Sequence, residues 1–292
     1  MSGYVAEVPM RWVDLDAQGH VNNALVVDYL QEARVAFLLA GPNAHLLGTS
    51  AVVVSHAVEF LRPIEYSVEP VTVEVSVCEV GAARYGVAYE VRQAGEVMAR
   101  ARTGMCVFDF AANRPRRLTV AERRWFADQQ RDSEPLRELA RYRVGESAHH
   151  HDLSVRWSDL DSYGHVNNVK LFDYLAEARI RMNPADPDRT RMHQAAQDDL
   201  TWMVVRQDVE YRGQITHRIE PYVVRTAYAA LGRTSMTLVA QVEDPLEPGL
   251  VLGRAQTVLV CADAAGRPVP LPEETARAAS LWPAVPQRNR TD

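Results

Sequence analysis

Residues 11–34 read RWVDLDAQGHVNNALVVDYLQEAR, and residues 156–179 read RWSDLDSYGHVNNVKLFDYLAEAR. The two stretches lie 156 − 11 = 145 positions apart and agree at 16 of 24 positions. The chain stays in phase further along, because VEFLRPI at 58–64 corresponds to VEYRGQI at 209–215. A repeat of this length predicts two domains of one fold rather than a solenoid of small units.

Each copy predicts the same order of elements. Apolar residues three and four apart follow the repeated motif, as one buried helix face requires; they are Val26, Tyr29, Leu30, Ala33 and Phe37, then Leu171, Tyr174, Leu175, Ala178 and Met182. Alternation with period two then predicts strands over 71–80, 85–91 and 96–110, and over 222–231, 234–244 and 250–263. A long helix followed by consecutive antiparallel strands predicts an α+β fold with the helix packed on the sheet.

The repeat and the composition together set the domain boundaries. We expect a first domain over 1–117, a polar linker with a short helix over 118–146, a second domain over 147–282 and a flexible tail over 283–292. The histidine run at 149–151 is predicted to be solvated and not to bind a metal, because no other ligand cluster accompanies it.

The composition is that of an ordinary globular protein, with 47% hydrophobic and 24% charged residues and a net charge of −6. Lys and Arg are scattered, which argues against a nucleic-acid partner. Three widely spaced cysteines suggest no disulfide framework. Neither a signal peptide nor a membrane span is recognisable, so we expect a cytoplasmic location without a membrane partner.

The motif itself combines acids, a glycine and asparagines at a helix start. Because Trp12, Asp14 and Asp16 alternate, we expect an incoming strand that places them on one face. Gly19 and its counterpart Gly164 permit a sharp turn or a close approach by a ligand. Either asparagine of each pair, Asn22 or Asn23 and Asn167 or Asn168, can cap the following helix.

This arrangement predicts chemistry as well as structure. An acid can attack a carbonyl or activate water, while unpaired N–H groups in the first helical turn hold the developing oxyanion. The competing interpretation is that the acids and asparagines only close turns and cap helices. Capping needs one such residue, whereas six polar or glycine positions of the loop recur while neighbours such as 17–18 differ, which favours function.

The string R-W-x-D-L-D-x-x-G-H-V-N-N followed by D-Y-L-x-E-A-R resembles the hotdog-fold thioesterases of the 4-hydroxybenzoyl-CoA thioesterase type, in both copies. The resemblance implies two fused hotdog domains, each a long central helix wrapped by a curved antiparallel sheet. Members with one hotdog pair into dimers with active sites at the interface, so the tandem copies would form an internal pseudo-dimer. Higher assembly is common in the family, which leaves a further homo-oligomer open.

Carried over by position, the family's catalytic carboxylate falls on Asp16 and Asp161. The resemblance also implies that His20 and His165, with Asn23 and Asn168, line or brace the site, although the histidines can equally be structural. No cofactor is implied, and the substrate would be an acyl-CoA.

The chemistry of a thioester suits such a site. A thiol has a pKa of about 8.5, so the thiolate leaves without a strong general acid. The chain contains no G-x-S-x-G motif, which disfavours a serine triad.

Three other functions compete with acyl-CoA hydrolysis. A hotdog enoyl-CoA hydratase would carry D-x-N-P-x-H, whereas Asp16 is followed by Ala-Gln-Gly-His. An acyl-ACP thioesterase is the second, since the motif around Asp161 resembles the second domain of the plant enzymes. A non-catalytic acyl-binding protein is the third, but loss of Asp16 and Asp161 would be its signature.

Four arginines are candidates for contacting the phosphates of the coenzyme, namely Arg62, Arg84, Arg100 and Arg102. The competing interpretation places them on the solvated face of a sheet, where charged side chains are common.

Overall fold

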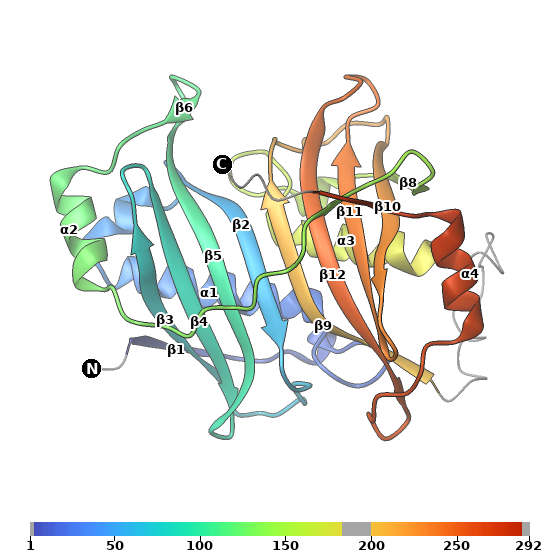
Figure 1. Ribbon diagram of the computed structural model, residues 1–292. Coiled ribbons are helices and arrows are strands. Elements are labelled where there is room, and N and C mark those ends of the chain that lie inside the picture. The colour runs from blue at the N-terminus through green and yellow to red at the C-terminus, as the bar shows by residue number, and fades with distance from the viewer. Residues whose placement is uncertain (1–2, 183–199, 288–292) are drawn as a thin grey trace. The chain divides into compact units, whose positions relative to one another are not determined.

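The structure is a computed structural model that describes residues 3–182 and 200–287. The chain divides into two compact units, Met1–Arg137 and Glu138–Asp292. Each unit contains an antiparallel sheet and a long helix (Figure 1). The predicted α+β class is therefore confirmed.

The first unit has a sheet with the strand order β1-β3-β4-β5-β2. Its strands are β1 (Tyr4–Val8), β2 (Ala51–Phe60), β3 (Val71–Val80), β4 (Arg84–Gln93) and β5 (Glu96–Asp109), with the short β6 (Arg114–Pro115) paired to β5. Its helices are α1 (Asn23–Leu39), α2 (Val120–Asp128) and the 3₁₀ helices η1 (Trp12–Asp14) and η2 (Pro42–Leu46).

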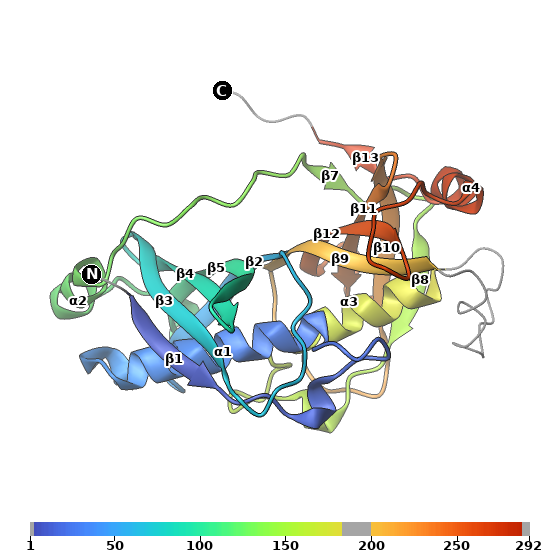
Figure 2. The same cartoon turned by 90° about the horizontal axis from the view of Figure 1, so that it is seen from below.

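Helix α1 lies along one face of this sheet (Figure 2) and contacts β1 and β3. Val26, Tyr29, Leu30, Ala33 and Phe37, the face predicted from their spacing, are buried. On β3 every second residue from Val71 to Val77 is fully buried, as a strand with one face on a core requires. The period of each pattern thus positions the core between helix and sheet.

The second unit repeats this topology with the strand order β9-β12-β11-β10-β8. Its strands are β8 (His149–Leu153), β9 (Leu200–Tyr211), β10 (Tyr222–Leu231), β11 (Ser235–Glu243) and β12 (Val251–Asp263), and the short β7 (Tyr142–Arg143) pairs with β13 (Val285–Pro286). Its helices are α3 (Lys170–Arg181), α4 (Glu273–Leu281) and the 3₁₀ helix η3 (Trp157–Asp159). All six strands expected from alternation are present, within a few residues of their predicted ends.

Segments expected to be solvated take part in these sheets. The histidines at 149–151 begin β8, which pairs with β10. His150 is exposed, while His149 and His151 are partly buried. Residues 285–286, expected in a flexible tail, form β13. Hydrogen bonding to a neighbouring strand is a long-range interaction that a local polar composition does not reveal.

The segment 118–146, expected to be a linker, is divided between the units. Its predicted short helix is α2, which packs on the first unit through a stacked pair of rings, Phe126 on Tyr85, with centroids 4.0 Å apart. The end of the segment contributes β7 to the second unit.

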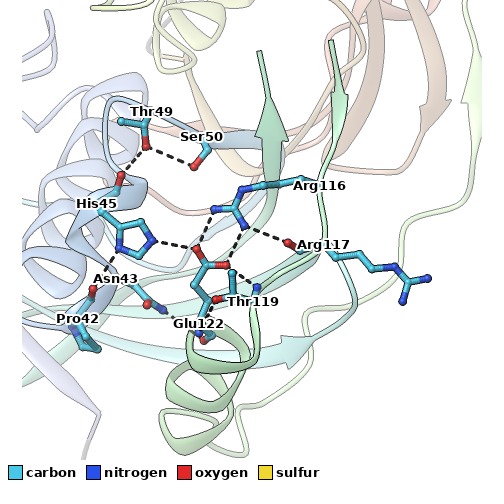
Figure 3. Close-up of polar contacts among 9 residues, drawn as sticks. All are labelled: Pro42, Asn43, His45, Thr49, Ser50, Arg116, Arg117, Thr119 and Glu122. Carbon is cyan, nitrogen blue, oxygen red and sulfur yellow. Dashed lines mark hydrogen bonds and ion pairs between the residues drawn. The ribbon is translucent and has the colours of Figure 1, made fainter. Parts of the chain in front are cut away.

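A buried carboxylate holds α2 in place (Figure 3). Glu122 accepts two hydrogen bonds from Arg116, at 2.8 and 2.9 Å, and lies 2.9 Å from the Nε2 atom of His45 in η2. Its side chain also accepts from the N–H of Thr119, whose hydroxyl accepts from the N–H of Glu122 in return. This reciprocal capping box begins the helix.

The two long helices begin differently. Helix α1 begins at Asn23, whereas α3 begins only at Lys170 after a tighter turn in which the N–H of Phe172 reaches the carbonyl of Val169. The Tyr211 hydroxyl donates to the carbonyl of Asn168 at 2.6 Å. The residue that corresponds to Tyr211 in the first copy is Phe60 (211 − 151 = 60), which has no hydroxyl to donate. In the second unit, Tyr211 therefore binds the Asn168 carbonyl, which a regular first helical turn would use.

Candidate active site

The loop before each long helix is anchored by a buried carboxylate. Asp14 is fully buried and accepts hydrogen bonds from the Tyr29 hydroxyl at 2.7 Å and from the Arg11 N–H at 2.9 Å. Asp159 does the same with Tyr174, at 2.7 Å, and with the N–H of Arg156, at 2.9 Å. Burial, together with the bond to the aspartate, raises the pKa of Tyr29 and of Tyr174.

The predicted strand through Trp12, Asp14 and Asp16 was wrong. Residues 12–14 form η1, because the Asp14 carboxylate bonds back to the backbone of Arg11 and closes a 3₁₀ turn. The backbone then extends at Leu15, so Asp14 is buried while Asp16 is partly exposed. The two carboxylates therefore have different environments despite their period-two spacing.

Asp16 and Asp161, the predicted catalytic residues, each close a short loop. The Asp16 Oδ1 atom accepts the N–H of Gln18 at 2.8 Å and that of His20 at 3.3 Å. The Asp161 Oδ1 atom accepts the N–H of Tyr163 at 2.8 Å. In both residues Oδ2 makes no hydrogen bond within 3–182 and 200–287, so one oxygen orients the carboxylate and the other is available to a ligand.

Gly19 and Gly164 let these loops close. Their φ angles are 81° and 77°, in the left-handed region, and a Cβ atom would meet nothing within 4 Å at either position. The glycines are therefore required by the backbone conformation rather than by space. The N–H groups of both glycines bond back to the carbonyls of Asp16 and Asp161.

The first turn of α1 contains a backbone N–H group, that of Asn23, without a hydrogen-bond acceptor among the described residues. Asn22 is the N-cap, and its side chain accepts the N–H of Ala24 at 3.0 Å. The N–H of Asn23 is bonded to no other described residue. In the second unit Asn167 accepts the N–H of Val169 at 3.3 Å, and Asn168 donates to Asn167 through its amide group at 3.1 Å. Asn22 thus caps α1, whereas Asn167 closes the turn before α3, whose N-cap is Val169. Asn23 is left with a backbone donor directed out of the helix start.

The two motif histidines are held by their backbones. His20 forms an isolated bridge with Glu65, and His165 forms one with Thr216. Neither imidazole is hydrogen-bonded to a residue in the described part of the chain, so the structure gives the rings no bracing role of their own.

A pocket of about 430 Å³ opens at Asp161. It is lined by Trp157, Leu160, Asp161, Ser162, Gly164, Thr216 and His217. This volume is within the range of about 300–1,000 Å³ that is usual for small-molecule sites. The Asp161 carboxylate, chosen from the sequence, therefore lines a cavity in which a ligand can reach it.

The arginines that were candidates for contacting the coenzyme phosphates bind other groups of the first unit. Arg62 forms an ion pair with Glu96, Arg100 pairs with Glu90 and Glu134, and Arg102 donates to Ser133 and to the carbonyl of Glu134. Arg84 is exposed on β4. Arg62, Arg100 and Arg102 are thus engaged by acids, a hydroxyl or carbonyl groups of the protein itself, and Arg84 interacts with the thiol of Cys106.

Sequence reasoning missed two features of the site. Tyr29 and Tyr174 were assigned to the apolar helix face, although their hydroxyl groups hold Asp14 and Asp159. The exposed ring at Trp157 was noted only as part of the motif. Recurrence of both tyrosines and both tryptophans in the repeat was the available signal.

No group of three or more His, Cys, Asp or Glu in residues 3–182 and 200–287 is arranged to hold a metal ion. Within the same residues, no helix has the length and hydrophobicity needed to cross a membrane.

Comparison with solved structures shows the fold. A protein from Lactobacillus plantarum assigned as an oleoyl thioesterase superposes with a TM-score of 0.69 at 16% identity, covering 92% of this chain and 97% of that one. An acyl-ACP thioesterase from Bacteroides thetaiotaomicron has a TM-score of 0.63 at 14% identity, with 88% and 96% coverage. The 12:0-ACP thioesterase from Umbellularia californica has a TM-score of 0.61 at 18% identity, with 87% and 95% coverage.

Sequence comparison identifies the family. A comparison with curated protein sequences found no match. The profile of the thioesterase-like superfamily, however, matches residues 10–127 and 155–279, which together make up most of the chain and contain both Asp loops. Together with the hotdog fold of the structural neighbours, this match establishes that the chain belongs to the thioesterase-like superfamily.

Proposed function

We propose that the chain hydrolyses acyl-CoA thioesters to a free acid and CoA, with Asp16 and Asp161 as the catalytic carboxylates. The observation that carries this proposal is the repeated carboxylate with one oxygen oriented by loop N–H groups and the other unbonded. Membership of a thioesterase superfamily supports hydrolysis of a thioester as the reaction.

The reaction needs few groups. As nucleophile, the free carboxylate oxygen attacks the thioester carbonyl, the C–S bond breaks, and water then cleaves the resulting anhydride. As general base, the carboxylate takes a proton from the water that attacks the same carbonyl. In both routes the sulfur leaves as a thiolate, and negative charge develops on the carbonyl oxygen.

The start of α1 is the proposed oxyanion site in the first unit. The N–H of Asn23 bonds to no other described residue, and the positive end of the helix dipole adds to its attraction for a negative oxygen. His20, with no hydrogen-bonded partner among the described residues, is placed beside this loop for contact with the substrate. His165 takes the corresponding role in the second unit, where α3 begins only at Lys170.

The test is release of free thiol from a panel of acyl-CoA esters, comparing the wild-type protein with the double variant Asp16→Asn/Asp161→Asn. Asn keeps the size of the side chain but removes its charge and basicity. We expect hydrolysis of some panel members by the wild type and a loss of at least about 100-fold in the double variant. An equally active double variant would refute the carboxylate mechanism.

Rapid mixing with enzyme in excess addresses the role of the carboxylate. A burst of thiol that precedes the free acid is the outcome that assigns the nucleophilic role.

Acyl-ACP hydrolysis is the second candidate. Its support is the similarity in fold to the two ACP thioesterases and the resemblance of DLDSYGHVNNVKLFDYL to the second domain of the plant enzymes. Parallel assays with one acyl group on CoA and on ACP distinguish the candidates through the ratio of the two kcat/KM values.

A further inference from the structure

An exposed tryptophan stands beside each candidate carboxylate. Trp157 is 75% exposed, and Trp12, at 157 − 145 = 12, is 73% exposed. Each is the first residue of a 3₁₀ helix whose last residue is the buried Asp159 or Asp14. The backbone of each tryptophan is therefore fixed, while most of its indole ring is left uncovered by the protein.

Each indole has an aromatic partner in the loop that follows the strand after the long helix. Trp157 packs edge-on against His217, with ring centroids 5.4 Å apart and planes at 80°. Trp12 packs in the same way against Tyr66, at 5.4 Å and 83°. Since 66 + 151 = 217, the pairs occupy equivalent positions in the two copies. Such edge-to-face packing limits the motion of an exposed ring.

The pair in the second unit belongs to the same cavity as the carboxylate. Trp157 and His217 line the pocket that also contains Asp161. A molecule whose carbonyl is within reach of Asp161 can therefore place one of its substituents against this pair.

The lining identifies which substituent fits. Within residues 3–182 and 200–287 no Lys or Arg lines the pocket, so these residues offer no cation to the diphosphate of a nucleotide. An acyl tail calls for an enclosed apolar pocket, whereas this wall is open and includes Ser162, Gly164 and Thr216. A neutral chain with amide groups suits an exposed aromatic wall and adjacent hydroxyl groups.

We propose that Trp157 with His217, and Trp12 with Tyr66, hold the pantetheine arm of the thioester substrate next to the carboxylate. This inference rests on the proposed thioesterase function. The arm is common to acyl-CoA and acyl-ACP, and the tryptophans act on both substrates alike. They set affinity for the thiol portion of the substrate and leave the chemistry to the aspartates.

The test compares four thioesters of one acyl group, carried by CoA, ACP, pantetheine or ethanethiol. The variants are Trp12→Ala/Trp157→Ala, the conservative Trp12→Phe/Trp157→Phe, and Leu246→Ala as a control at another exposed apolar residue. Thermal melting checks that each variant folds.

We expect the alanine pair to lower kcat/KM about tenfold for the CoA, ACP and pantetheine esters, mainly through KM. The ethanethiol ester, which lacks the arm, should react at the wild-type rate. The phenylalanine pair should recover most of the loss, and Leu246→Ala should change nothing.

Three results would overturn the inference. An equal loss with the ethanethiol ester would place the indoles against the acyl group. A loss with the CoA ester alone would place them against the nucleotide, and a loss with the ACP ester alone would place them against the carrier protein.

Binding separates this inference from the function on which it rests. Free pantetheine is titrated by calorimetry into the wild-type protein, the alanine pair and Asp16→Asn/Asp161→Asn. Binding that the alanine pair loses and the aspartate variant keeps supports the arm site even if no ester is hydrolysed. Equal binding by the wild type and the alanine pair, or no binding by either, refutes it.

Discussion

At the scale of single residues, the two aspartates of each DLD motif have separate tasks. Asp14 is buried and bonded to Tyr29, while Asp16 is partly exposed with one free oxygen. A buried carboxylate is tolerated only when hydrogen bonds replace its lost hydration. The first aspartate of each pair therefore positions the loop that presents the second.

Removing the Tyr29 hydroxyl tests this positioning. We expect Tyr29→Phe to lower the free energy of unfolding by about 2 kcal/mol, because a buried carboxylate loses a charged hydrogen bond. Urea unfolding measures the change. Tyr4→Phe is the matched control, since the Tyr4 hydroxyl has no hydrogen-bonded partner among the described residues. A change below 0.5 kcal/mol, taken as roughly the scatter of surface substitutions, would contradict the anchoring role.

The Tyr85 hydroxyl presents the opposite case. It is buried and has no hydrogen-bonded partner in the described part of the chain, and burial raises the pKa of Tyr85. Because an unsatisfied buried hydroxyl destabilises the folded state, we expect Tyr85→Phe to raise the free energy of unfolding by about 1 kcal/mol. The ring and its stacking on Phe126 are retained. A loss of stability in urea unfolding would mean that the hydroxyl has a partner after all.

At the scale of elements, a single acid, Glu122, anchors the start of α2. The hydrogen bonds from Arg116 lower the pKa of Glu122 most. Burial raises this pKa, and the bond from His45 lowers it further, so that it falls from 4.5 to about 2. A carboxyl group whose pKa is depressed by folding contributes stability that is complete above its unfolded pKa and is lost as the pH falls. The relevant window is therefore pH 4.5 to 2.

We expect Glu122 to contribute up to about 3 kcal/mol above this window. Unfolding measured at pH 7 and at steps down to pH 2.5 should show the wild type losing more stability than Glu122→Gln does. Glu7→Gln, at an exposed position on β1, is the control and should follow the wild type. Parallel curves for the wild type and Glu122→Gln would rule out the depressed pKa.

At the scale of the whole molecule, duplication supplies two complete loops. Both units retain the carboxylate, the left-handed glycine, the buried acid and its tyrosine. They differ in the start of the long helix, where Tyr211 replaces Phe60. The different helix start leaves both candidate carboxylates, Asp16 and Asp161, in place.

We therefore expect two competent sites. Asp16→Asn and Asp161→Asn should each retain part of the wild-type kcat, and the two residual activities should sum to about the wild-type value when the sites act independently. Steady-state assays of both single variants under saturating substrate measure this. One silent variant beside one fully active variant would show that a single half carries the activity.

Local patterns in the sequence determined the repeat, the order of its main elements, the core faces of α1 and α3, and six of the strands almost to the residue. Helix and strand periods are short-range properties, so burial of one face follows directly from them. The repeated polar loop also favoured function over capping alone, and the resemblance of the motif to the hotdog thioesterases placed the expected carboxylates at Asp16 and Asp161. These conclusions needed no knowledge of distant contacts.

Tertiary structure alone decided the rest. Asp14 and Asp16 look equivalent in sequence, but a hydroxyl 15 residues away on α1 buries the first and turns the predicted strand into η1. Tertiary contacts also decided the pairing of the histidines at 149–151 with β10. They likewise decided that the candidate arginines bind acids and carbonyl groups of the first unit. Each outcome depends on which partner the fold brings within about 3 Å, and hydrogen bonds act only at that range.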